Sequence, residues 1–454
     1  SSVENTNNSN KVYIGGLFGG ANNTNININN SSTNSNVIAV SSGQIDAGGL
    51  VGELPGGTVN NCYATGKITV TTTVTTGGVT VGGLIGECRG AINQSYATGD
   101  VISTAPTAIR IGGLTGYTIG ALNQCYATGD VEATSKSGEI QIGGLVGYQD
   151  TTVTQSYAIG DVVAKSTTGI IYSGGLVGRW PSGKILKSYS TGNINAKTET
   201  SEVNAGGLIG SGWSRRIHYL TDAYSVGAVT AISTGGNVHA GGLIGDTYYT
   251  STTNTYAVGK IKSETNGTNN SGGLVGRNVG SSTVKNSYWS PKTTGQDTSA
   301  GGEEKSIQEL LYETGYTDWD FNTIWTIEPN GGSLAYLRDL PKPDGITQEE
   351  LVYETRVPVY VKDTEGKGLK GGKFVVKNEA GTIVKEGTSN SKGIFYMLDL
   401  EAGIYTVEEK EAPEPYKLNK EVKKFKLTDG ALVEDVTSGE KITLEFVHEL
   451  IGVT

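Results

Sequence analysis

Ile142-Gly143-Gly144-Leu145-Val146-Gly147, followed after a short variable stretch by Ser156-Tyr157-Ala158-Ile159-Gly160-Asp161-Val162, is one copy of a motif that recurs along most of this chain. The second glycine of each copy returns at intervals of 30 to 35 residues, at Gly16, Gly49, Gly83, Gly113, Gly144, Gly175, Gly207, Gly242 and Gly273. A period this narrow predicts a solenoid, because one such repeat has too little apolar surface to be stable alone and must bury it against its neighbours.

The contents of the repeat predict that the solenoid is made of β-strands. Short runs such as Lys67-Ile-Thr-Val-Thr are bounded by Gly, Ser, Thr and Asn, which is typical of strands joined by tight corners. We therefore expect a β-solenoid (β-helix) of about nine coils of roughly 31 residues, with equivalent residues stacked about 4.8 Å apart. We expect the recurrent leucine and tyrosine to fill the interior as ladders, and the glycines to allow positive φ and close packing at the corners.

Composition and charge exclude several classes of protein. The 454 residues carry a formal net charge of −10, which argues against binding to nucleic acid or to an anionic membrane surface. No apolar run is long enough to span a bilayer, and Ser1 begins no signal peptide, so we expect a mature or trimmed product. The three cysteines, Cys62, Cys88 and Cys125, are interpreted as small buried residues without disulfides.

Motifs for catalysis, cofactors and metals are missing. The chain has three histidines in three separate places and no HExxH, and GGLVG lacks the Lys-Ser/Thr of a phosphate-binding loop. Asp100, Asp130 and Asp161 share a column after the tyrosine, and we interpret them as solvated corner residues rather than as a cation site. We expect no catalytic residue, no cofactor and no metal.

Per-repeat variation is concentrated in the loop after each GGLxG, on the edge where solenoids usually bind their ligands. Aromatic and arginine residues gather there on three consecutive repeats, and this composition suits glycan stacking or protein contact. An alternative is that they cover the apolar end of the stack or contact a neighbouring domain. The candidate binding residues are Arg179, Trp180, Trp213, Arg215, Arg216, Tyr248 and Tyr249.

The repeats resemble the GLUG-motif repeat of large secreted or surface-anchored bacterial proteins, including adhesins. The resemblance rests on the recurrent GG-L-[VI]-G and SYATG text and on the ending Ser287-Tyr288-Trp289-Ser290-Pro291. It implies an extracellular repeat scaffold and no particular reaction.

The text changes after the last repeat. Ser306-Ile307-Gln308-Glu309 predicts a capping box that opens a short helix, running to about Glu313. The aromatic-rich segment up to Leu340 is interpreted as a cap that shields the last coil, and 341–345 as a stiff proline-containing linker. The expected organisation is a flexible N-terminus (1–11), a solenoid (12–300), a cap and linker (301–343) and a β-sandwich (344–454).

The last hundred residues predict a β-sandwich of short alternating strands. Leu369-Lys-Gly-Gly-Lys-Phe374 and Ile404-Tyr-Thr-Val-Glu-Glu409, followed by Ala412-Pro413, resemble the Cna-B or SpaA-type domain of pilins and adhesin stalks, with its prealbumin-like, Ig-like fold. Many members of that family carry a Lys–Asn isopeptide bond promoted by a buried acid. Glu409 matches the acid, but Val361 and His448 stand where the reactive lysine and asparagine belong, so no isopeptide bond is expected.

Three functions remain open. The leading one is a non-enzymatic bacterial adhesin or stalk, at the cell surface or secreted, whose rigid solenoid binds a protein or glycan ligand on a host or neighbouring cell. A self-assembling subunit of a surface fibre or layer, a homo-polymer, is the alternative. A polysaccharide-active β-helix enzyme is the third, although no paired carboxylates can be assembled from the sequence of neighbouring repeats.

Overall fold

The computed structural model describes residues 2–5, 11–347, 356–390, 392–398, 400, 402–428 and 432–451. The chain forms two compact units, Ser1–Gln348 and Glu349–Thr454. Both are built almost wholly of β-strands, which confirms the all-β class predicted from the sequence.

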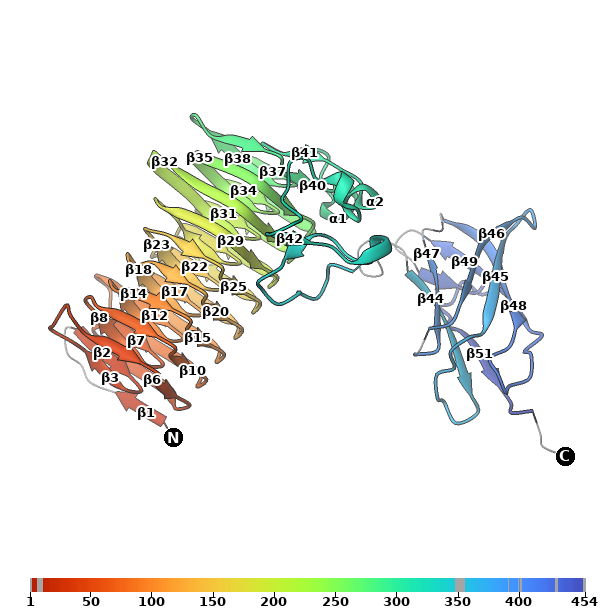
Figure 1. The fold of residues 1–454 in the computed structure, drawn as a ribbon, viewed down its shortest axis with the longest axis horizontal. Helices are drawn as coiled ribbons and strands as arrows, with labels where there is room; N and C mark the ends of the chain where they lie inside the picture. Colours follow the sequence, from red (N-terminus) through yellow and green to blue (C-terminus); the bar gives the residue numbers. More distant parts are fainter. Residues whose placement is uncertain are drawn as a thin grey trace. The chain divides into compact units, whose positions relative to one another are not determined.

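The first unit is a β-solenoid of about nine turns, in which each strand pairs in parallel with its counterpart in the next coil (Figure 1). Two of its sheets have nine strands each, one strand from every coil. The first consists of β1 (Ser2–Asn5), β6 (Asn36–Ser41), β11 (Ile68–Thr72), β16 (Val101–Ala105), β21 (Val131–Ser135), β26 (Val162–Ser166), β30 (Ile194–Thr198), β33 (Val229–Ser233) and β36 (Ile261–Thr265). The second, which leads into each GGL, consists of β2 (Lys11–Gly15), β7 (Gln44–Gly48), β12 (Gly78–Gly82), β17 (Ala108–Gly112), β22 (Ile140–Gly143), β27 (Ile171–Gly174), β31 (Val203–Gly206), β34 (Val238–Gly241) and β37 (Asn269–Gly272).

The third sheet has 23 strands because most coils contribute two or three short segments to it. Those that follow GGL are β3 (Phe18–Gly20), β8 (Val51–Leu54), β13 (Ile85–Cys88), β18 (Thr115–Thr118), β23 (Val146–Gln149), β28 (Val177–Arg179), β32 (Ile209–Ser225), β35 (Ile244–Ala257) and β38 (Val275–Val279). The middle segments are β4 (Asn27–Asn29), β9 (Thr58–Asn60), β14 (Ala91–Asn93), β19 (Leu122–Asn123), β24 (Val153–Thr154), β29 (Lys184–Ser190) and β39 (Thr283–Lys285). The tyrosine segments are β5 (Ser32–Thr33, where serine replaces tyrosine), β10 (Tyr63–Ala64), β15 (Tyr96–Ala97), β20 (Tyr126–Ala127), β25 (Tyr157–Ala158) and β40 (Tyr288–Trp289), with β41 (Glu303–Glu304) closing the sheet.

The N-terminus differs from its expectation. Residues 1–11 were expected to be flexible, but Ser2–Asn5 form β1, which pairs in parallel with β6, and Lys11 begins β2. The reason is that the strand edges of the following coil offer backbone partners to these residues.

The solenoid interior is divided into two apolar cores, with the glycine corner between them. At this waist the second glycine of GGL faces the alanine that follows the tyrosine: a Cβ on Gly144 would lie 2.1 Å from the carbonyl oxygen of Gly175 and 2.9 Å from the Cβ of Ala158. Only glycine fits this gap, and so the repeat keeps both its GG and its alanine. These glycines do not have positive φ, contrary to expectation. The left-handed corner of each coil is instead one residue such as Gln124 (φ 54°) or Gln155 (φ 46°).

The leucine column is buried as expected, apart from Leu17 in the first coil, but the tyrosine column is not interior. The tyrosines stack on the outer face of the solenoid, and Tyr63 is 37% exposed. The correction follows from strand alternation: in each Tyr-Ala pair the alanine points into the waist, so the adjacent tyrosine must point outward. We call the eight stacked residues the tyrosine ladder: Tyr63, Tyr96, Tyr126, Tyr157, Tyr189, Tyr224, Tyr256 and Tyr288.

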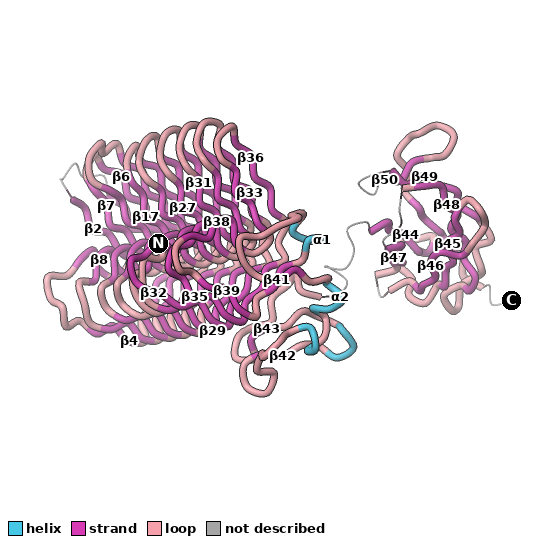
Figure 2. Tube along the Cα trace, turned by 90° about the horizontal axis from the view of Figure 1, so that it is seen from above, coloured by secondary structure: helices cyan, strands magenta, loops and turns pink. Residues whose placement is uncertain are grey.

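The segment after the last coil begins with α1 (Pro291–Thr294) and α2 (Ile307–Leu310), followed by the 3₁₀ helix η1 (Glu313–Gly315). The predicted capping box at Ser306 is confirmed, since its hydroxyl accepts from the Glu309 amide and the Glu309 carboxylate accepts from the Ser306 amide. The chain then folds back along the solenoid as a strap, residues 316–346, which contains β42 (Trp325–Thr326), η2 (Pro329–Gly331) and β43 (Tyr336–Leu337). Figure 2 shows β42 and β43 beside β29 of the solenoid.

The strap covers several coils, not only the last one. Its end was expected to be a stiff linker, but Pro343 and Ile346 are buried, and the Pro341 carbonyl accepts a hydrogen bond of 3.0 Å from the Tyr189 hydroxyl. Its proline and aromatic side chains have an apolar surface to pack against, because the tyrosine ladder lies on the outside of the solenoid.

The second unit contains two sheets around one apolar core. One is formed by β47 (Ile394–Leu398), β44 (Arg356–Asp363) and β51 (Leu444–His448); the other by β46 (Ile383–Thr388), β45 (Lys373–Asn378), β48 (Gly403–Glu411), β49 (Val422–Thr428) and β50 (Leu432–Glu434). The sequence analysis predicted six of these eight strands and missed β46 and β50.

Candidate functional site

An exposed aromatic platform lies on coils seven to nine of the solenoid. In coils seven and eight the loop after GGLxG is replaced by the continuous strands β32 and β35, and their register places Trp213 beside Tyr248 and Tyr248 beside Val279. Trp213 is 48% exposed, and its ring stacks on Tyr248 with 4.7 Å between centroids. Tyr249, at φ 58°, packs edge-on against Tyr248. We call Trp213, Tyr248, Tyr249 and Val279 the aromatic platform; three of them were predicted as binding residues.

Trp180, also predicted as a binding residue, is fully buried in the solenoid core. Its ring packs edge-on against His218 at 4.2 Å between centroids, and the His218 Nε2 lies 2.9 Å from the Thr250 hydroxyl. The sequence does carry the signal for burial: Trp180 stands four residues after its GGL leucine, the same offset as the buried Leu54 and Cys88. It therefore stabilises the core and is not available to a ligand.

The three predicted arginines do not form part of the described platform. The Arg179 guanidinium lies 3.0 Å from a Glu139 carboxylate oxygen and 4.9 Å from the Tyr172 ring centroid, on another strip of the surface. The side chains of Arg215 and Arg216 lie outside the described residues.

Sequence analysis missed a polar seam where the GG corner brings two outward-facing columns together. The first column contains the residue two before the first glycine of each copy: Tyr13, Asp46, Thr80, Arg110, Gln141, Tyr172, Asn204, His239 and Asn270. The second contains the residue three after the GGL leucine: Glu53, Glu87, Tyr117, Tyr148, Arg179, Ser211, Asp246 and Arg277. Contacts join the columns, as where Arg110 lies 5.3 Å from the Tyr117 ring centroid. The signal in the sequence is a polar or aromatic residue at two fixed offsets from GG.

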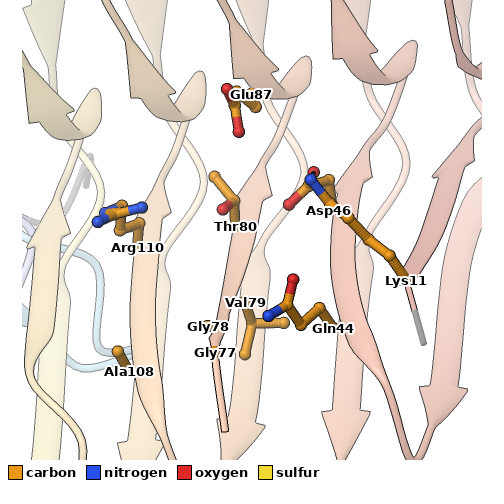
Figure 3. Close-up of a pocket in the computed structure, with 10 residues that line it drawn as sticks. All are labelled: Lys11, Gln44, Asp46, Gly77, Gly78, Val79, Thr80, Glu87, Ala108 and Arg110. Atoms are coloured by element: carbon orange, nitrogen blue, oxygen red, sulfur yellow. Dashed lines mark ion pairs between the residues drawn. The ribbon is translucent and has the colours of Figure 1, made fainter.

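A cavity of about 320 Å³ lies at the N-terminal end of the polar seam, lined by Lys11, Asp46, Thr80, Glu87 and Arg110 among others (Figure 3). The Lys11 ammonium lies 2.9 Å from the almost fully buried Asp46 carboxylate. Burial raises the pKa of Asp46 to about 6, and Lys11 acts against this shift.

Carboxylate oxygens of Asp46, Glu53 and Glu87 lie within 4.8 Å of one another, a grouping that the sequence analysis did not assemble. Two of the three are already paired with cations: Asp46 with Lys11, and Glu87 with Arg89 at 2.8 Å. The arrangement is thus an ion-pair network of the surface. The aspartate column is likewise occupied, since the Asp130 carboxylate accepts a hydrogen bond of 2.8 Å from the Asp161 backbone amide.

In the second unit, Glu409 and His448 form a buried pair, with Nε2 of His448 2.8 Å from Oε1 of Glu409. Glu409 also accepts a hydrogen bond of 2.9 Å from the Asn419 amide. Val361 is buried on β44, beside Phe446 of β51. The position of the family acid is thus occupied by a hydrogen-bonded carboxyl group, whose partner is the histidine that replaces asparagine.

Two family models match parts of this chain. Residues 43–71 match the GLUG motif, and residues 356–441 match the SpaA prealbumin-like fold domain. The chain therefore combines a GLUG-repeat solenoid with a SpaA-type domain, as the resemblance of the sequence indicated.

Among curated proteins, the chain is 41% identical over 80 residues to a putative Gly-rich membrane protein of Evansella cellulosilytica, covering 16% of this chain and 9% of that protein. It is 33% identical over 170 residues to halomucin of Haloquadratum walsbyi, covering 31% of this chain and 2% of that protein. The chain thus spans less than a tenth of the length of either relative. Among solved structures, the major pilin subunit BcpA of Bacillus cereus shares 22% identity over 21% of this chain and 28% of its own, with a TM-score of 0.17.

Proposed function

We propose that this chain is a non-enzymatic part of a bacterial surface protein, an extracellular adhesin or stalk whose solenoid presents the aromatic platform to a protein or glycan ligand. The observation that carries this proposal is the half-exposed indole of Trp213, held in place by stacking on Tyr248. Exposed aromatic rings fixed on a rigid scaffold are typical binding hot spots, because they bury much area and lose little conformational entropy.

Composition and the family matches support the same proposal. GLUG and SpaA-type modules are building blocks of surface proteins by resemblance, and the acidic chain disfavours nucleic acid as a partner. Within the described residues, no helix combines the length and apolar character needed to cross a lipid bilayer.

A binding screen of the purified chain against glycan arrays and immobilised matrix proteins tests the proposal. We expect Trp213→Ala to weaken the binding of any ligand found by at least about tenfold, the size of a hot-spot truncation. Tyr312→Ala is the matched control, because Tyr312 is equally exposed but lies in the segment after the last coil. Binding that is unchanged in Trp213→Ala, or no binding at all, would reject the platform as the adhesive site.

A self-assembling subunit is the second candidate, favoured by the edges of the second unit. Strand β46 is an edge of the five-stranded sheet, and Ile383 at its start is 48% exposed. Such an edge offers unpaired backbone groups to another chain. Light scattering and negative-stain electron microscopy over a concentration series separate the two candidates: ordered fibres or layers support assembly, and single particles at every concentration support the adhesin.

A further inference from the structure

The tyrosine ladder is one continuous surface, but only half of it is covered. Neighbouring rings from Tyr63 to Tyr256 stack with centroids 4.6–5.1 Å apart and planes within 8° of parallel. The four C-terminal members are 0–1% exposed: Tyr189, Tyr224, Tyr256 and Tyr288. The four N-terminal members, Tyr63, Tyr96, Tyr126 and Tyr157, are half-buried or exposed. The chemistry of the face is therefore the same on both halves, and only the covering differs.

The strap supplies the covering by binding tyrosine hydroxyls with its backbone. The Tyr256 hydroxyl donates to the Ala335 carbonyl at 2.9 Å, and the Tyr189 hydroxyl donates to the Pro341 carbonyl at 3.0 Å. The Tyr288 hydroxyl accepts from the Thr317 amide at 2.9 Å. A phenol can both donate and accept, so the ladder binds peptide carbonyls and amides without reading one particular side chain.

Side chains add to this contact at the edges of the ladder. Trp325 packs against Tyr224 at 5.9 Å between centroids, and its indole NH donates to Asp222. At the far end of the strap, Asp339 accepts a hydrogen bond of 3.3 Å from the side-chain amide of Gln155. Gln155 occupies the left-handed corner beside Tyr157, and Gln124 and Gln94 occupy the same position in the next two coils. The uncovered half thus repeats the amide groups that the strap uses where it ends.

We propose that Tyr63, Tyr96, Tyr126 and Tyr157 form a second binding surface, which takes an extended polypeptide segment of another protein laid along the ladder as the chain's own strap is. The surface is continuous with the strap contact inside this chain, and that contact shows the mode of recognition: backbone groups on the hydroxyls, aromatic side chains alongside, and an acidic side chain on the glutamine column.

The stacking geometry favours a peptide over a glycan. Sugars bind aromatic residues by packing against the face of a ring, but each interior face of the ladder is covered by the next tyrosine about 5 Å away. What the ladder offers is ring edges and hydroxyls, which suit the polar backbone of an extended chain. The surface therefore differs from the aromatic platform both in position and in chemistry, and its existence does not depend on the platform's ligand.

A random peptide library displayed on phage and selected on the full chain tests the proposal. Peptides that are enriched are then measured by calorimetry against the wild-type chain and the Tyr96→Phe/Tyr126→Phe variant, which loses two hydroxyls and keeps the stacked rings. We expect the dissociation constant to rise about tenfold, since each hydrogen bond contributes roughly 1 kcal/mol. Tyr219→Phe, an exposed tyrosine outside the ladder, and Trp213→Ala, on the platform, are controls expected to leave peptide affinity unchanged.

The proposal is overturned if no peptide is enriched, or if the enriched peptides bind the double phenylalanine variant as tightly as the wild type. A glycan array run in parallel covers the other class of ligand: glycan binding that disappears in the double variant would identify the ladder as a carbohydrate site instead. Far-ultraviolet circular dichroism of each variant confirms that the solenoid is folded before binding is compared.

Discussion

Nε2 of His448 lies 2.8 Å from Oε1 of Glu409, with both side chains buried in the second unit. The two residues stand where the SpaA-type resemblance places a reactive asparagine and its acid catalyst. Because the third member of the set is Val361, which has no amine, the carboxyl group of Glu409 has a hydrogen-bonding role here. We therefore predict that the intact mass of the purified chain equals the sum of its residues, with no loss of ammonia; a mass lower by one ammonia would contradict this.

The missing bond can be restored by substitution. Val361 pairs with Phe446, two residues before His448, so side chains at 361 and 448 project from the same face of neighbouring parallel strands. In Val361→Lys/His448→Asn, we predict that the lysine amine attacks the asparagine carboxamide next to Glu409, forming an amide and releasing ammonia. Mass spectrometry detects this loss, and the same double variant with Glu409→Ala is the control that should keep its full mass. A folded double variant with unchanged mass would show that these three positions are insufficient.

The repeat period, the leucine column and the second domain could be predicted from the sequence because each depends on local text. The position of the tyrosine column was mispredicted for a physical reason. In a strand, neighbouring side chains point to opposite faces, so Ala158 and Tyr157 cannot both be interior. The small Ala158 is the one that fits against Gly144, but that contact joins two parts of the coil and becomes visible only when the corner has been built.

Trp180 and Trp213 should respond in opposite ways to the same substitution. Trp180→Ala removes a fully buried ring from the core and is expected to lower the free energy of unfolding by about 3–5 kcal/mol. Trp213→Ala removes a half-exposed ring and should cost less than about 1 kcal/mol. Urea denaturation of the two variants, monitored by circular dichroism, gives the comparison. Equal losses of stability would mean that the two indoles are equally buried.

The aromatic platform was partly predictable because Trp213 and Tyr248 stand in the variable loops of consecutive repeats. The polar seam was not found because its columns, for example Arg110 and Tyr117, belong to different sheets and meet only through the bend at the glycine pair. Counting offsets from the GGL leucine would have placed Trp180 inside, since offset four is a buried column and offset three an outward one.

The glycine corner predicts a sharp contrast between two Gly→Ala substitutions. A Cβ on Gly144 would lie 2.1 Å from the Gly175 carbonyl oxygen, so Gly144→Ala must push two coils apart. We expect it to cost at least 1–3 kcal/mol, the usual range for overpacking, and to lower the melting temperature accordingly. At Gly235, the nearest atom to an added Cβ is 3.4 Å away, so Gly235→Ala should leave the melting temperature close to that of the wild type. Calorimetry of both variants tests the close approach; equal melting temperatures would contradict it.

The tyrosine ladder predicts a loss of stability at alkaline pH. Burial, with the neighbouring Tyr157 and Tyr96, raises the pKa of Tyr126 to about 12, and burial raises the pKa values of Tyr224 and Tyr256 well above the ordinary 10. An unfolded chain releases these protons near pH 10, whereas the folded chain holds them longer, so ionisation favours the unfolded state. Stability should therefore be constant with respect to these groups below about pH 10 and should fall as the pH rises from 10 to 12. Denaturation midpoints measured across this range, with phenolate absorbance followed in parallel, test the prediction. Tyr126→Phe removes one of the titrating groups and should make the fall shallower, while a slope equal to that of the wild type would show that Tyr126 titrates normally.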